Sequence, residues 1–161
     1  MTRIIQKSVV ISLAFSLMAM ALVSCGGTPV TEVHNLKIKM AAAADVNPDM
    51  ESRPSPIILH ILELSSIDQF NRADYFSLTR DDAASLGGDV LNKTEIILTP
   101  GSSKETELEL NVQTSFLGFV AGYRDIDRSQ WRVTQEVIPG KTDWVSVNLE
   151  KQKITIIEVN D

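Results

Sequence analysis

The run Ile57-Ile58-Leu59-His60-Ile61-Leu62 places apolar side chains on both faces of an extended strand. A strand with one wet face alternates apolar and polar residues, whereas a strand buried on both faces reads as a nearly continuous apolar run. This run therefore predicts a central strand that is covered on both sides.

Strand signals of the alternating kind lie on either side of this run. In residues 34–42, every second position is apolar and Lys37 and Lys39 fall on the other face, which is typical of a half-buried strand. Turns such as Pro100-Gly101 and Pro139-Gly140 separate further strands. These strands are predicted over residues 95–99, 107–112, 116–124, 131–137, 144–149 and 153–159. About eight regularly spaced strands predict an all-β sandwich of two antiparallel sheets.

A short helical insert is predicted directly after the second strand. Ser66-Ile67-Asp68-Gln69 matches the capping box, in which a Ser and a Gln side chain satisfy backbone donors at a helix start. The apolar residues that follow are expected to pack on the sheet as core, namely Phe70, Ala73, Tyr75, Phe76, Leu78 and Leu86.

The amino-terminal segment differs from the rest of the chain. Arg3 and Lys7 precede an uncharged apolar run over residues 9–23. A helix of that length reaches about 22 Å, which is less than the roughly 30 Å of a bilayer core. We therefore expect residues 1–24 to be a signal peptide rather than a spanning helix, with a buried core helix as the alternative.

Leu22-Val23-Ser24-Cys25 follows this apolar run and resembles a bacterial lipobox. The resemblance implies cleavage before Cys25 and acylation of that residue, with residues 25–30 as a lipidated tether and residues 31–161 as a periplasmic domain. Gly26 stands where an Asp would favour retention in the inner membrane, so the outer membrane is expected. The alternative is ordinary signal cleavage, which would leave Cys25 as a free thiol.

Composition excludes several classes of function. The formal net charge of −6 is the wrong sign for a protein that binds nucleic acid through phosphates. One Cys and two His cannot build a thiolate and imidazole zinc site, and one Cys cannot form an intramolecular disulfide. The sequence contains no Gly-x-Ser-x-Gly motif, and it offers no set of residues that could be assigned as a catalytic triad. We expect no cofactor, no metal, no small-molecule substrate and no catalytic residue.

Two segments are candidates for binding. Residues 45–56 contain Pro48, Pro54 and Pro56 and form a loop longer than most connections, so they indicate either a functional loop or a permissive surface loop. Residues 124–132 concentrate Arg, Asp and Trp, which indicates a structural corner between two strands in preference to a binding site.

Several of these segments together resemble the outer-membrane lipoprotein of type VI secretion systems, the TssJ family. The resemblance is carried by Asn47-Pro48-Asp49, Arg53-Pro54-Ser55-Pro56-Ile57-Ile58-Leu59, Phe70-x-x-Ala73-Asp74-Tyr75-Phe76-x-Leu78, Leu86-Gly87, Pro100-Gly101, Gly118-Phe119-Val120-Ala121-Gly122-Tyr123-Arg124-Asp125 and Trp131-Arg132. The chain departs from the family pattern at Tyr123, where Phe is common, and at Leu62-Glu63-Leu64, where Tyr-Gln-Leu is common.

The resemblance implies a transthyretin-like β-sandwich without enzymatic activity that lies under the outer membrane. It also implies binding to the periplasmic C-terminal domain of the inner-membrane protein TssM through the loop between the first two strands. That contact maps here onto residues 45–54, and we expect it to involve Val46, Asn47, Pro48, Asp49 and Met50.

Two other classes of function stay open at this point. A transthyretin-like hydroxyisourate hydrolase would need a Tyr-Arg-Gly-Ser tail, whereas this chain ends Ile157-Glu158-Val159-Asn160-Asp161. A generic outer-membrane lipoprotein helper, such as a secretin pilot or a ligand-binding sandwich, is the stronger alternative.

Overall fold

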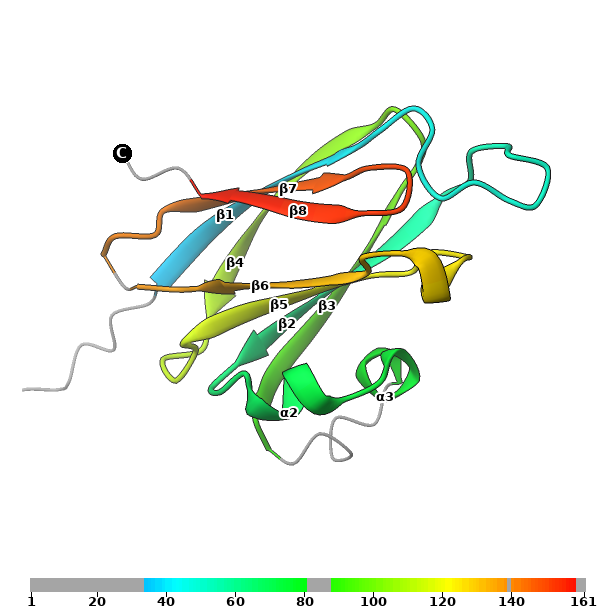
Figure 1. The fold of residues 1–161 in the computed structure, drawn as a ribbon. Coiled ribbons are helices and arrows are strands. Elements are labelled where there is room, and N and C mark those ends of the chain that lie inside the picture. The colour runs from blue at the N-terminus through cyan, green and yellow to red at the C-terminus, as the bar shows by residue number, and fades with distance from the viewer. Residues whose placement is uncertain (1–33, 81–87, 139, 159–161) are drawn as a thin grey trace, which may run out of the picture. The chain divides into compact units, whose positions relative to one another are not determined.

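The computed structural model describes residues 34–80, 88–138 and 140–158 (Figure 1). These residues form eight strands and three short helices. In chain order they are β1 (His34–Ala42), β2 (Ile57–Leu64), α2 (Asp68–Arg72), α3 (Tyr75–Thr79), β3 (Val90–Leu98), β4 (Ser103–Leu110), β5 (Phe116–Ala121), η3 (Ile126–Arg128), β6 (Arg132–Glu136), β7 (Trp144–Leu149) and β8 (Ile154–Glu158). The predicted signal peptide, the tether with Cys25, and Leu86-Gly87 lie outside the described residues.

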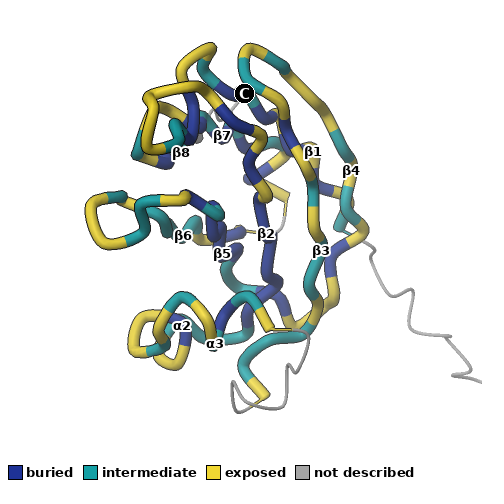
Figure 2. Tube along the Cα trace, turned by 90° about the vertical axis from the view of Figure 1, so that its right-hand side faces the viewer, coloured by how far each residue is buried: buried dark blue, intermediate teal, exposed yellow. Residues whose placement is uncertain are grey.

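The strands form two four-stranded sheets that face each other as two layers (Figures 1 and 2). One sheet has the order β4-β1-β7-β8 and the other has the order β3-β2-β5-β6. The predicted eight-stranded sandwich is confirmed. It departs from the all-antiparallel prediction at one place, because β1 and β7 pair in parallel, with Lys37 opposite Trp144 and Ala42 opposite Leu149. Alternation of side chains indicates which face of a strand is buried but not the direction of its neighbour, so the sequence could not reveal this pair.

β2 is the central strand that its apolar run predicts. Ile57, Leu59 and Ile61 point into the main core between the sheets, and none is more than 1% exposed. The residues of the opposite pleat include Leu62 and Leu64, which pack in a second core under the helices. Figure 2 shows buried residues along most of β2. Both faces of β2 are therefore covered, one by the other sheet and one in part by the helical insert.

The helical insert lies on the outer face of the β3-β2-β5-β6 sheet (Figure 1). It is two short helices rather than one, because Ala73 has an extended backbone and ends α2. The predicted capping box does not form: Ile67 occupies the N-cap of α2 without a side-chain hydrogen bond. Asp74 caps α3 instead, where its Oδ1 accepts a 2.9 Å hydrogen bond from the backbone N–H of Ser77.

Gly118 allows the insert to approach the sheet closely. A Cβ atom at this position would lie 2.6 Å from Cε2 of Phe70 and 3.0 Å from Cδ1 of Leu64. Phe70 is only 2% exposed and fills the second core. Because Gly118 has no side chain, the Phe70 ring can occupy the space beside β5 that a β-carbon would fill.

Among the described residues, no helix has the length and apolar character needed to cross a bilayer.

Candidate functional site: the loop between the first two strands

The loop of residues 43–56 joins β1 to β2 and projects beyond the sheets, at the upper right of Figure 1. Its base is held by the domain. Val46 is 0% exposed and belongs to the main core. Its carbonyl accepts a 3.1 Å hydrogen bond from the backbone N–H of Ser55. This bond closes a neck, and residues 48–54 form a tip beyond it.

Asn47 connects the neck to two other segments of the domain. It is 3% exposed and adopts the left-handed conformation with φ of 49°, which Asn tolerates better than most residues do. Its backbone N–H donates to the carbonyl of Lys151 at 3.1 Å. Its side-chain amide donates to the carbonyl of Pro56 at 2.8 Å, and its Oδ1 accepts from the backbone N–H of Arg124 at 2.7 Å. One buried residue therefore fixes the tip relative to the turn after β5 and to the turn between β7 and β8.

Asp49 organises the tip itself. Its Oδ1 accepts hydrogen bonds of 2.9 Å from the backbone N–H groups of both Glu51 and Arg53, and its Oδ2 accepts one of 2.8 Å from Arg53 Nε. The backbone N–H of Arg53, followed by the other hydrogen bonds from Arg53 and Glu51, lowers the pKa of Asp49 below its ordinary value. The Arg53 guanidinium also lies 2.9 Å from Glu51 Oε2. The tip is thus a closed ring of hydrogen bonds and ion pairs.

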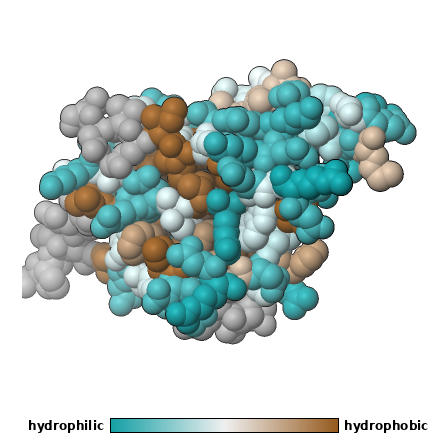
Figure 3. All heavy atoms as spheres, viewed as in Figure 1, coloured by the Kyte–Doolittle hydropathy of each residue, from teal (hydrophilic) through white to brown (hydrophobic). Residues whose placement is uncertain are grey.

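Met50 stands at the end of this ring and is fully exposed, at 102%. Side chains around it are mainly polar, and the loop region of Figure 3 is mostly hydrophilic. A large apolar side chain presented on a rigid polar tip is suited to insertion into a pocket of another protein.

A groove of about 920 Å³ separates the tip from the segments to which Asn47 connects it. One wall is the tip, from Pro48 to Arg53, and the other comprises Arg124, Asp125, Arg128, Lys151 and Gln152. Four of the lining residues are basic and three are acidic, in a chain whose net charge is −6. The groove is therefore more positive than the chain as a whole.

The structure divides the five predicted partner-binding residues into two groups. Val46 and Asn47 are buried and build the base of the loop, so they are not available as surface contacts. Pro48 and Asp49 are partly exposed and Met50 is fully exposed. Sequence reasoning treated the loop as a linear stretch and missed the basic residues that the fold brings beside it, Arg124, Arg128 and Lys151. For Arg124 and Arg128, the only signal in the sequence was the charged cluster at residues 124–132.

That cluster serves two purposes. Its first part connects β5 to β6, as the predicted corner between two strands requires. Arg132, at the start of β6, holds the helical insert: its guanidinium donates to the carbonyls of Phe70, Asn71 and Ala73 at 3.0, 3.0 and 2.9 Å. It also lies over the Trp131 ring, 4.8 Å from its centroid. Arg124 and Arg128 instead point to the groove at the other end of the segment.

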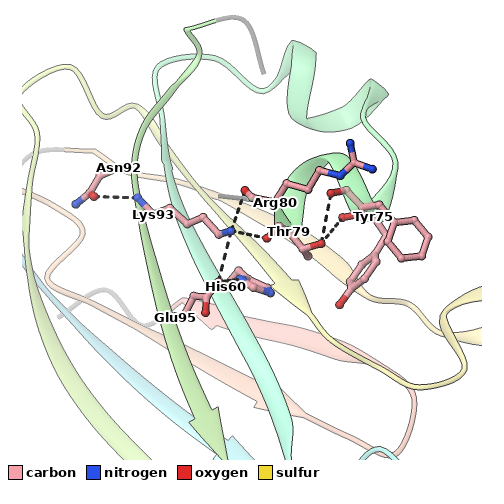
Figure 4. A network of polar contacts seen from close by, with 8 residues as sticks. His60, Tyr75, Thr79, Arg80, Asn92, Lys93 and Glu95 are labelled. Atoms are coloured by element: carbon pink, nitrogen blue, oxygen red, sulfur yellow. Dashed lines mark hydrogen bonds and ion pairs between the residues drawn. The ribbon is translucent and has the colours of Figure 1, made fainter. Parts of the chain in front are cut away.

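A second polar cluster lies under α3 and includes His60 (Figure 4). Lys93 Nζ donates to the carbonyls of Thr79 and Arg80 at 2.7 and 3.2 Å and lies 3.5 Å from Glu95 Oε1. His60 Nδ1 lies 2.9 Å from the same carboxylate oxygen. These contacts fasten the end of α3 to β2 and β3. Across the described ranges, no group of three or more His, Cys, Asp or Glu is placed to hold a metal ion.

Comparison with known proteins identifies relatives of this domain. The profile of the T6SS-SciN family, described as type VI secretion lipoprotein, VasD, EvfM and TssJ, matches residues 34–152. No curated protein matches the chain. The crystal structure of the T6SS lipoprotein TssJ1 from Pseudomonas aeruginosa is similar with a TM-score of 0.75 and 37% identity, over 79% of this chain and 97% of that one. The part shared with this chain thus makes up almost all of that relative.

Two further solved structures share the fold at lower identity. Serratia marcescens Lip, a membrane-bound component of the type VI secretion system, has a TM-score of 0.71 and 23% identity, over 80% of this chain and 99% of that one. A chain from the structure of the TssM C-terminal domain from EAEC has a TM-score of 0.64 and 21% identity, over 79% of this chain and 100% of that one. The profile match over most of the chain, together with the 37% identity to TssJ1, shows that this chain belongs to the type VI secretion lipoprotein family.

Proposed function

We propose that this chain is an outer-membrane lipoprotein that binds the periplasmic C-terminal domain of TssM through the tip of the β1–β2 loop. The contact residues are Pro48, Asp49 and Met50. Its role is to connect the outer membrane to the inner-membrane part of the secretion apparatus, and no catalytic step is assigned to it.

The observation that carries the proposal is the combination of a fixed tip with a fully exposed Met50. The ring around Asp49 and the buried Asn47 order the tip before any partner arrives. Binding by an ordered loop costs less conformational entropy than binding by a flexible one. An exposed methionine supplies an adaptable apolar contact.

Acylation of Cys25 would supply the membrane attachment. Each buried CH₂ group contributes about 0.8 kcal/mol, so one acyl chain binds marginally and two or more hold stably. A triacylated cysteine would keep the chain at the membrane. Membership of the type VI secretion lipoprotein family favours this function over a secretin pilot or a ligand-binding sandwich.

The experiment replaces the tip and leaves the base intact. Residues 48–54 are exchanged for a short Gly-Ser-Gly bridge in the domain of residues 31–161, while Val46, Asn47 and Ser55 are kept. We expect the affinity for the TssM C-terminal domain, measured by calorimetry, to fall at least about a hundredfold, as expected when central interface residues are lost. Deleting the whole loop would be a poorer test, because it removes Val46 from the core.

Thermal unfolding of the same variant provides the control. The tip makes no contribution to the main core, so the midpoint should stay within a few degrees of that of the wild type. Unchanged affinity in a folded variant would show that the tip is not the contact.

A further inference from the structure

The basic side chains that line the groove beside the tip differ in whether a nearby carboxylate neutralises their charge. Arg53 is neutralised within the tip, because it lies 2.8 Å from Asp49 Oδ2 and 2.9 Å from Glu51 Oε2. Arg128 lies 3.7 Å from Asp125 Oδ2 and is 83% exposed, which is a weak surface pair.

Arg124 and Lys151 are different. Both are exposed and line the groove, and neither makes an ion pair with a carboxylate in the described part of the chain. They come from segments far apart in the sequence, the turn after β5 and the turn between β7 and β8. The fold brings two unneutralised positive charges to one wall of the groove in a chain with net charge −6.

The backbone at both basic residues is held in place by Asn47. The N–H of Arg124 donates to Asn47 Oδ1 at 2.7 Å, and the carbonyl of Lys151 accepts from the backbone N–H of Asn47 at 3.1 Å. The spacing between the tip and these two cations is therefore fixed by one buried residue. Only their side chains remain free to adjust to a ligand.

We infer that this groove binds an acidic segment of the same partner whose apolar pocket receives Met50. Arg124 and Lys151 provide the positive charge, and the inference rests on the proposed function. A carboxylate-bearing segment fits because it supplies the neutralisation that the chain itself does not provide. The apolar tip then gives affinity, and the basic wall gives orientation and a faster encounter.

An anionic membrane surface is the competing ligand for two exposed cations. The structure favours a protein, because the charge of the groove is mixed. The wall is interrupted by Asp125, and Asp49 and Glu51 line the facing side. This mixed charge suits a segment with defined positions better than a uniformly negative surface.

The test is the double substitution Arg124→Glu with Lys151→Glu in the domain of residues 31–161. Binding of the TssM C-terminal domain is measured by calorimetry and stopped-flow at low and high salt. We expect the affinity to fall about tenfold or more at low salt, mainly through a slower association rate, and the difference from the wild type to shrink as salt screens the charges.

The matched control is Arg72→Glu with Lys104→Glu, which makes the same change in net charge at exposed positions of α2 and β4. It should leave the affinity within about twofold of the wild type, because neither Arg72 nor Lys104 lines the groove. An equal loss in this control would show a general charge effect and overturn the inference.

The remaining outcomes separate the inference from the function on which it rests. If the tip replacement abolishes binding but the Arg124 and Lys151 substitutions do not weaken it, the inference is wrong and the proposed function stands. If the wild-type domain does not bind the TssM domain at all, the proposed function fails and the inference fails with it.

A flotation assay tests the competing ligand with vesicles of phosphatidylethanolamine and phosphatidylglycerol at low salt. Binding of the wild-type domain that is lost in the double variant would assign the groove to lipid and overturn the inference.

Discussion

The side-chain oxygen of Asn47 accepts a 2.7 Å hydrogen bond from the backbone N–H of Arg124. These residues lie 77 positions apart in the sequence. The bond joins the loop after β1 to the turn after β5, and so sets the position of the tip relative to its basic wall. Asn47, which the sequence predicted as a partner contact, is thus a buried residue that holds the tip and the groove wall in position.

Replacing Asn47 with Ala is expected to destabilise the domain. The change removes two buried side-chain hydrogen bonds, to Pro56 and Arg124. It also places alanine at a φ of 49°, a left-handed conformation that Asn tolerates better than Ala does. Leaving a buried donor or acceptor unsatisfied costs about 1–3 kcal/mol each, so a loss of about 2–4 kcal/mol in the free energy of unfolding is expected in urea denaturation.

Asn47→Gly is the informative companion to this variant. It accepts the positive φ but also lacks the side chain, so the difference between the two variants isolates the backbone cost. A wild-type unfolding midpoint for Asn47→Ala would show that these hydrogen bonds do not hold the loop.

Replacing Met50 with Asp is expected to change binding without changing stability. Met50 is fully exposed, so its replacement removes no packing in the isolated domain. A charge at the centre of a dehydrated contact should weaken binding to the TssM C-terminal domain about tenfold or more. Val112→Asp is the matched control, because Val112 is 71% exposed in the turn between β4 and β5, away from the groove. Equal effects of the two substitutions on the measured dissociation constant would count against the tip.

Gly118→Ala is expected to destabilise the domain through the helical insert. The new Cβ would lie 2.6 Å from the Phe70 ring, which must move within a filled core. Overpacking of this kind costs about 1–3 kcal/mol. The double variant with Phe70→Leu should lose less stability than the sum of the two single variants, because the smaller side chain leaves room for the methyl group. Strict additivity in chemical denaturation would show that the two residues do not compete for the same space.

The sequence predicted the fold more completely than it predicted the site. The double-sided burial of β2 and the alternation in β1 could be inferred because each is encoded in a local pattern of apolar residues. The parallel pairing of β1 with β7 could not, because it joins residues about a hundred positions apart and depends on how the sheets assemble.

The candidate site was predicted as a segment, and its residues were chosen because they are neighbours in the sequence. Proline content indicated the loop correctly, but local composition does not reveal that Asn47 turns inward at a positive φ. Lys151 carries no local signal at all, because only the β7–β8 turn brings it to the groove. Asp49 could have been recognised from its spacing to Arg53, since Asp commonly bonds backbone N–H groups just after it in a turn.

Acid should loosen the tip before it unfolds the sandwich. Hydrogen bonds from the backbone N–H of Arg53, the Arg53 side chain and the backbone N–H of Glu51 lower the pKa of Asp49 below its ordinary value of 3.8. A lowered folded-state pKa means that the contribution to stability is present above pH 3.8 and is lost as pH falls through the lower value of the folded state. Amide hydrogen exchange at Glu51 and Arg53 should therefore accelerate, relative to core amides, only below that pH.

Asp49→Asn is the control for this titration. It keeps an acceptor oxygen but has no carboxyl group to protonate, so the acid-dependent step at the tip should disappear. A step that persists in Asp49→Asn would assign the titration to another group. Asp74, whose pKa the Ser77 N–H lowers, would be the next carboxyl to test.

Arg132→Lys is expected to release the helical insert from the sheet while the sandwich stays folded. The guanidinium reaches three carbonyls around the end of α2 at 2.9 to 3.0 Å and stacks on Trp131. A lysine ammonium keeps the charge but cannot present the same planar set of donors, so about 1–2 kcal/mol of local stability should be lost. Hydrogen exchange should then accelerate in α2 and α3 but not in β1 or β7, which lie in the other sheet. Arg72→Lys, at an exposed position of α2, is the matched control and should leave exchange unchanged. Acceleration spread evenly over both sheets would show that Arg132 supports the whole domain rather than the insert.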